Sequence, residues 1–214
     1  MQKICIFQLT VFYRGYNYLQ VTEVILPKTL VTINEGAFAY CEQLERVTMY
    51  EGVTKILWSA FCGCYNLKSI KIPDSVVLID QTAFLQCSDL EEVVLSKDSQ
   101  LQTIGLQAFL KCSSLKSFYV PKKVLSLNNM ASDCSIRLNG EYSSLGYGAF
   151  YECTSLKSII FENTLTKING YTFQGCMALT DVYYTGTKSE WNAVTIGTGN
   201  GSITSATMHY NYVN

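Results

Sequence analysis

Apolar and polar positions along the chain recur together with a period close to 23 residues. In each period a phenylalanine that follows alanine or threonine is succeeded by a cysteine after three residues and a leucine after six. The phenylalanines are Phe38, Phe61, Phe84, Phe109, Phe150 and Phe173, in steps of 23, 23, 25, 41 and 23 residues. The cysteines are Cys41, Cys64, Cys87, Cys112, Cys153 and Cys176. Repetition at this period is the signature of a repeat architecture.

After each leucine the apolar spacing changes to alternation, which predicts a short strand with one inward face. Proline follows at Pro27, Pro73 and Pro121, where its missing N–H suits the end of a strand. We predict eight strands, at 24–26, 47–49, 70–72, 93–95, 118–120, 136–138, 159–161 and 182–184. An apolar residue returns seven residues beyond most strands, as at Ile33, and the loop 96–100 accounts for the 25-residue step.

The 41-residue step divides into 18 and 23 residues if Ile136–Leu138 is a strand, because Leu145 again follows seven residues after Leu138. This division predicts a shortened repeat near 121–138, which lacks the usual phenylalanine, cysteine and leucine around Met130.

Three-residue strands with one apolar face cannot bury that face alone, so consecutive turns must stack and share a core. Stacked strands lie about 4.8 Å apart. The phenylalanine and cysteine columns are expected inside, behind the sheet. The Phe-x-x-Cys-x-x-Leu spacing predicts a short helical or 3₁₀ segment in each turn.

The pattern Ala-Phe-x-x-Cys-x-x-Leu-x-x-Val-x-Ile-Pro, nearly complete from Ala60 to Pro73, resembles the BspA-like leucine-rich-repeat family. The tail from Val182 to Tyr212 also resembles a C-terminal cap found in that family. The resemblance implies a leucine-rich-repeat solenoid, a curved right-handed coil of about eight turns with a parallel sheet on its concave face. It also implies a non-enzymatic binding or adhesion module, on a bacterial cell surface or secreted.

This organisation divides the chain into an N-terminal cap segment at 1–17, repeats at 18–186 and a C-terminal cap at 187–214. The apolar run Ile4–Tyr13 is interrupted by Gln8 and Thr10, and no Ala-x-Ala site follows, so we expect a strand or extended segment there rather than a signal peptide. Without a convincing signal peptide, a cytoplasmic location stays open.

Composition removes several function classes. A formal net charge of −1 offers no basic excess for nucleic acid, and no run of about 18 uncharged apolar residues predicts a membrane span. The single histidine, His209, argues against most imidazole metal sites and catalytic triads, and we interpret it as a polar residue of the cap. The glycine-rich segment 197–201 lacks the features of a phosphate-binding loop. We therefore expect no enzyme activity and no cofactor.

The nine cysteines invite a disulfide or metal interpretation. Six of them form the repeat column, where free cysteine behaves as a small buried hydrophobe, and parallel side chains are poorly aimed for pairing. We expect free thiols and no metal site. Cys5, Cys62 and Cys134 fall outside the column. If any thiols are exposed, we expect them to be these three.

Each strand presents one outward residue between its inward ones. This column reads Ile25, Thr48, Lys71, Val94, Tyr119, Arg137, Ile160 and Tyr183. Aligned aromatic, aliphatic and arginine side chains suit a surface that binds a protein or glycan ligand, although β-propensity alone also places such residues in strands. Tyr119, Arg137, Ile160 and Tyr183 are the stronger half. An intracellular protein-interaction scaffold that uses the same face is the alternative.

Overall fold

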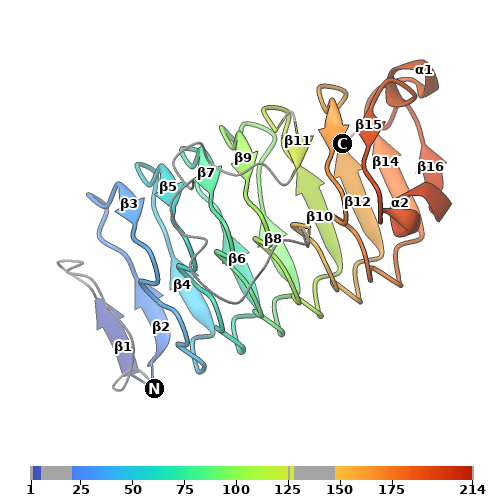
Figure 1. Cartoon of the computed structure of the whole chain (residues 1–214). Coiled ribbons are helices and arrows are strands. Elements are labelled where there is room, and N and C mark those ends of the chain that lie inside the picture. The colour runs from blue at the N-terminus through green and yellow to red at the C-terminus, as the bar shows by residue number, and fades with distance from the viewer. Residues whose placement is uncertain (1, 6–20, 125, 128–147, 214) are drawn as a thin grey trace, which may run out of the picture.

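The computed structural model describes residues 2–5, 21–124, 126–127 and 148–213. Its strands form two rows along the molecule, and every pairing within them is parallel (Figure 1). The long-strand row contains β1 (Gln2–Cys5), β2 (Val21–Ile25), β4 (Arg46–Thr48), β6 (Ser69–Lys71), β8 (Glu92–Val94), β10 (Ser117–Val120), β12 (Ser158–Phe161), β14 (Asp181–Tyr184) and β16 (Thr207–His209). The short-strand row contains β3 (Thr32–Ile33), β5 (Lys55–Ile56), β7 (Leu78–Ile79), β9 (Thr103–Ile104), β11 (Ser126–Leu127), β13 (Lys167–Ile168) and β15 (Thr195–Ile196).

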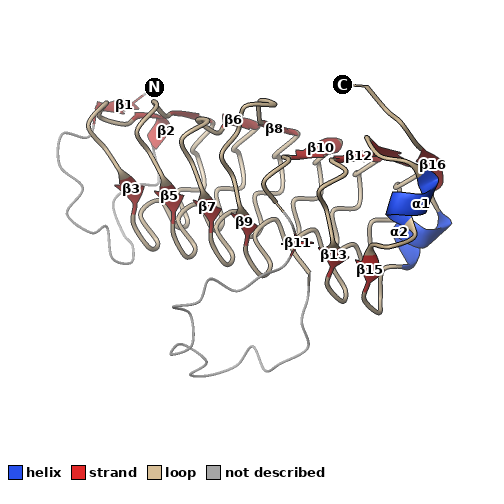
Figure 2. Ribbon diagram, turned by 90° about the horizontal axis from the view of Figure 1, so that it is seen from above, coloured by secondary structure: helices blue, strands red, loops and turns tan. Residues whose placement is uncertain are grey.

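The predicted solenoid is confirmed, with about seven stacked turns rather than eight. Seven of the predicted strands correspond to β2, β4, β6, β8, β10, β12 and β14. The apolar residues expected after each strand sit in the short-strand row, where Ile33, Ile56 and Ile79 are fully buried. Figure 2 shows the two rows on different sides of the coil, so each turn contributes two strands that enclose the core.

The prediction of a strand at 136–138 between β10 and β12 is wrong. β10 pairs directly with β12, with Tyr119 opposite Ile160, and β11 pairs with β13, with Leu127 opposite Ile168. β10 and β11 therefore belong to an ordinary turn of the coil, and most of the predicted shortened repeat near 121–138 lies outside the described residues. The 41-residue step is one 23-residue repeat plus 18 inserted residues between β11 and Ala149. Residues 128–147 lie outside the described part of the chain.

The segments that carry phenylalanine and cysteine are short hydrogen-bonded turns, where the spacing predicts a short helical or 3₁₀ segment. Bonds from N–H to the carbonyl three residues earlier occur, such as Leu85 N to Thr82 O at 3.0 Å, as in 3₁₀ structure. A left-handed residue then breaks the helix, as at Gln86 with φ 60°. Alternate N–H groups of the segment reach the next turn, since Phe84 N donates to Ala108 O and Gln86 N donates to Leu110 O.

The core is a stack of identical side chains. The six phenylalanines lie ring on ring, with centroids 5.2–5.5 Å apart and planes within 12° of parallel. Such offset aromatic pairs contribute about 0.5–1.5 kcal/mol each beyond the area that they bury. Because the rings stack between adjacent turns, stability is distributed along the whole coil.

The C-terminal end of the coil is closed by α1 (Lys188–Trp191) and α2 (Gly201–Ser205). Thr187 and Glu190 form a reciprocal capping box at the start of α1. Buried Asn200 takes the place of a missing next turn, since its Oδ1 accepts Phe173 N at 3.0 Å and its Nδ2 donates to Asn169 O and Gly197 O. At the other end, β1 pairs in parallel with β2.

Candidate functional site

The outward face of the long-strand row, here the sheet face, carries the residues that the sequence analysis selected. Seven of them occupy equivalent outward positions of successive strands, with the register Ile25 to Thr48, Lys71 to Val94, and Tyr119 to Ile160 to Tyr183. All seven are partly or fully exposed. Arg137 lies outside the described residues, and its expected place between Tyr119 and Ile160 does not exist, because those two residues are direct neighbours.

The column continues into the C-terminal cap, which the sequence analysis did not foresee. β16 pairs with β14 and places His209 beside Tyr183, with ring centroids 4.5 Å apart and planes 14° from parallel. The ring of Tyr212 packs on Tyr183 as well, at 4.7 Å. The alternating residues Met208 and His209 could have indicated this strand. However, α2 makes the separation between Val182 and Met208 longer than the 23-residue repeat, so the repeat pattern does not reveal it.

A second outward column was also missed, because each strand presents an outward residue on both sides of its central buried one. In the C-terminal half this flank contains Glu92, Ser117, Ser158, Asp181 and Thr207. Small serines lie beside the large residues Tyr119 and Ile160 of the first column. The large side chains therefore stand above their surroundings on this flank.

We call the continuous set Val94, Tyr119, Ile160, Tyr183 and His209 the aromatic strip. Hydrogen bonds orient two of its side chains, Tyr119 and His209. Tyr119 donates its hydroxyl to Glu162 Oε1 at 2.7 Å, while Glu162 Oε2 accepts from Thr185 Oγ1 at 3.1 Å. Burial and the neighbouring carboxylate raise the pKa of Tyr119, so its hydroxyl stays protonated and remains a donor.

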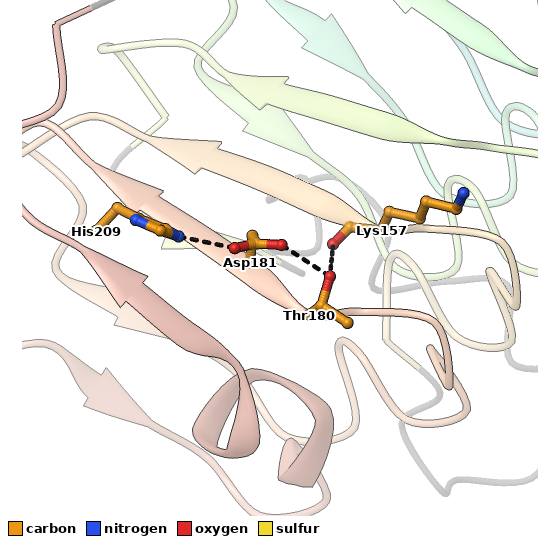
Figure 3. A network of polar contacts seen from close by, with 4 residues as sticks. All are labelled: Lys157, Thr180, Asp181 and His209. Carbon is orange, nitrogen blue, oxygen red and sulfur yellow. Dashed lines mark hydrogen bonds and ion pairs between the residues drawn. The ribbon is translucent and has the colours of Figure 1, made fainter.

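At the C-terminal end of the strip a polar network orients His209 (Figure 3). His209 Nε2 lies 2.7 Å from Asp181 Oδ1, and Thr180 donates its hydroxyl to Asp181 Oδ2 at 2.8 Å and contacts Lys157 O at 3.4 Å. The hydrogen bonds from His209 and Thr180 lower the pKa of Asp181. The side chains of His209 and Asp181 are 39% and 35% exposed, so this end of the strip is accessible to a ligand.

Two of the carboxylates around the aromatic strip, Glu92 and Glu162, have no lysine or arginine partner among the described residues, whereas Asp181 is bonded to His209. Glu92 is exposed and forms no ion pair there, and Glu162 accepts hydrogen bonds only from hydroxyl groups. The neighbouring Lys116 is paired with Glu91. In Figure 3 the side chain of Lys157 extends away from Asp181. The C-terminal half of the sheet face therefore combines an apolar, aromatic centre with acidic flanks.

The six cysteines of the repeat column lie in the core and do not reach the sheet face. All six are buried free thiols, and five donate to the carbonyl of a phenylalanine in the preceding turn, as Cys87 Sγ does to Phe61 O at 3.2 Å. Burial raises the pKa of Cys41 to about 11 and that of Cys176 to about 12. Such thiols are poor nucleophiles and poor metal ligands.

Cys62, one of the three cysteines in which exposure was considered, is buried, with only 4% of its surface exposed. Burial raises the pKa of its thiol as well. The structure does not describe the side chains of Cys5 and Cys134.

The described residues show little that catalysis would need. They contain no group of three or more His, Cys, Asp or Glu side chains that could hold a metal ion. Over the same residues, His209 bonds to Asp181 but to no serine, threonine or cysteine that it could activate. No helix in the described segments has the length and apolarity to cross a membrane.

Comparison with known proteins agrees with this architecture. A leucine-rich repeat protein of T. pallidum has 26% sequence identity and a TM-score of 0.64, over 82% of this chain and 73% of that one. The pneumococcal vaccine antigen PcpA shares the fold, with 18% identity and a TM-score of 0.52, over 87% of this chain and 50% of its own. No curated protein sequence matches the chain significantly.

The family comparison covers most of the chain. The model of the BspA type leucine-rich repeat region matches six copies, over residues 11–136 and 130–196. Repeat modules of this kind are associated with protein interaction, which agrees with a regular exposed sheet face and a core filled by structural columns. The chain belongs to the BspA-type leucine-rich repeat family.

Proposed function

We propose that this chain is a non-enzymatic binding module that recognises a protein or glycan ligand through the sheet face and acts on a bacterial cell surface. The observation that carries the proposal is the aromatic strip, in which partly exposed aromatic and aliphatic side chains lie in register over the four strands β10, β12, β14 and β16, with exposed Val94 on the adjacent β8. Tyrosine is enriched among interface hot spots, and exposed apolar residues that align in this way mark interaction sites.

The fixed positions of the strip's tyrosine side chains support the proposal. Tyr119 is fixed by Glu162, and Tyr183 is held between His209 and Tyr212. Side chains that are already immobilised lose less conformational entropy when a ligand binds, a cost of about 0.5–1.5 kcal/mol for each flexible side chain. On the described strands of the N-terminal half, β2 to β6, the outward residues include Arg46 and Lys71 and no aromatic side chain.

The test is a binding screen of the purified chain against a printed glycan array and a library of displayed extracellular protein domains. For any ligand found, Ile160→Asn and Tyr183→Ser should each weaken binding at least about tenfold, in line with hot-spot losses. Met177→Ser is the control, since Met177 is 85% exposed and lies outside the sheet face. Unchanged binding by both strip variants, with thermal melts that show intact folding, would remove the sheet face as the binding site.

An intracellular scaffold that uses the same face remains the second candidate. The free thiols do not favour it, because buried thiols with raised pKa values resist oxidation in either compartment. Protease added to intact cells distinguishes the two locations. Surface display predicts cleavage of the chain without lysis, and full protection would support the scaffold.

A further inference from the structure

We propose that the aromatic strip binds a basic amphipathic helix of a protein partner, laid along the axis of the coil across the strands. This inference rests on the proposed function of the sheet face and adds the chemistry and shape of its ligand. Three features of the strip carry it: its apolar centre, the charge of its flanks and the spacing of its side chains.

The centre of the strip calls for apolar partners. Ile160 stands between Tyr119 and Tyr183, and Val94, which is 38% exposed, precedes Tyr119. An aliphatic side chain between two aromatic rings offers no hydrogen bond to a sugar hydroxyl, whereas it packs well against leucine or a similar residue. The centre therefore favours a protein segment over a glycan.

The flanks specify the charge of that segment. Glu92 and Asp181 lie on one side of the strip and Glu162 lies on the other. No lysine or arginine of the described residues stands in these outward positions from β8 to β16. Basic residues on both edges of an apolar stripe would face these carboxylates, and such complementary charges steer association and fix orientation.

The spacing specifies the conformation. Adjacent strands lie about 4.8 Å apart, so the five positions of the strip span about 19 Å. A helix repeats its apolar stripe every 5.4 Å, and it would drift from this spacing by only about 0.6 Å per turn. An extended chain, with same-face side chains about 6.7 Å apart, loses register about three times faster. Roughly three and a half helical turns cover the strip.

The probes are three synthetic 18-residue peptides whose binding is followed by fluorescence anisotropy. The first places leucines on one helical stripe with lysines elsewhere, the second permutes the same residues so that the leucines share no face, and the third replaces lysine with glutamate. We expect the first peptide to bind at least about tenfold more tightly than either of the others, a difference of about 1.4 kcal/mol.

Variants of the protein assign the contacts. Ile160→Asn should weaken the first peptide at least about tenfold, and the control Met177→Ser should leave it unchanged. The double variant Glu162→Gln, Asp181→Asn keeps the size of both side chains and one acceptor oxygen in each, and it removes two charges. It should weaken binding mainly at low salt and flatten its salt dependence, because surface charges are screened by ions.

The outcomes separate this inference from the function on which it rests. Equal binding of all three peptides, or none by the first, overturns the helix. If Ile160→Asn still abolishes binding of a ligand from the screen, the sheet face survives as the binding site without the helix. If Ile160→Asn affects neither the peptide nor the screened ligand, both proposals fail.

Discussion

This protein should lose stability at a lower alkaline pH than most proteins do, because the repeat places cysteine thiols in its core. The six thiols of the column are each 5% exposed or less. In an unfolded chain a cysteine has a pKa near 8.5. In the folded protein burial raises the pKa to about 11 at Cys41 and about 12 at Cys176, and raises it well above the usual value at the four cysteines between them.

The direction of the effect follows from proton linkage. Above about pH 8.5 the unfolded chain releases thiol protons that the folded protein keeps, so stability is fully present below that pH and declines as the pH rises toward the folded-state values. At about pH 9.5 each thiol removes about 1.4 kcal/mol, and six together remove about 8 kcal/mol. That amount is comparable to the whole unfolding free energy of a typical domain, about 5–15 kcal/mol.

Urea titrations followed by circular dichroism, at several values between about pH 7.5 and 9.5, measure this loss. The double variant Cys87→Ala, Cys112→Ala is the matched control, since it should begin less stable yet lose about a third of the pH dependence above pH 8.5. An unfolding free energy that stays flat across this range, or a double variant with the slope of the wild type, would refute the buried column of thiols.

Three further predictions concern the same architecture. Asn200→Ala should lower the unfolding free energy by about 2–4 kcal/mol in urea melts, because Phe173 N and the carbonyls of Asn169 and Gly197 lose their partner. The control, Asn192→Ala at an exposed position, should change it by no more than about 0.5 kcal/mol. Gly105→Ala should cost about 1–3 kcal/mol in thermal melts, since a Cβ there would lie 2.6 Å from Gln81 N; Gly201→Ala, which meets nothing within 4 Å, should cost nothing. Maleimide should label all nine thiols in urea but at most two in the native protein, because seven are buried, and labelling of more than two would contradict the assigned burial.

The sequence was sufficient to predict the core because every inward position recurs. Phenylalanine, cysteine and leucine keep their offsets in six turns, and a buried column tolerates little variation. The same regularity located the outward residues of seven strands. Repetition thus supplies in one chain the kind of evidence that usually needs many sequences.

The insertion was misassigned because the arithmetic of its spacing admits two solutions. A 41-residue step is either 18 plus a 23-residue repeat or a repeat plus an 18-residue insertion, and the alternation at Ile136–Leu138 favoured the first. The absence of the phenylalanine, cysteine and leucine columns near Met130 pointed to the second. The direct pairing of β10 with β12 decides between them.

The full extent of the candidate site required the structure. His209 joins the strip because β16 pairs with β14. The helix α2 lies in the longer segment before β16, so the repeat spacing does not predict this pairing. The acidic flanks depend on which neighbours stand side by side, as Glu162 does beside Tyr119 from 43 residues away. Such contacts depend on which residues of adjacent turns lie next to each other. The sequence period predicts these neighbours only when the position of the insertion is known.

Site-specific photocrosslinking tests the central claim, that a ligand lies on the aromatic strip. Benzoylphenylalanine is placed at Ile160 in one protein and at Met177 in another, and each is irradiated with the ligand found in the binding screen. We expect a crosslinked product from position 160 and none from position 177. Crosslinking from position 177 alone, or equally from both, would contradict it.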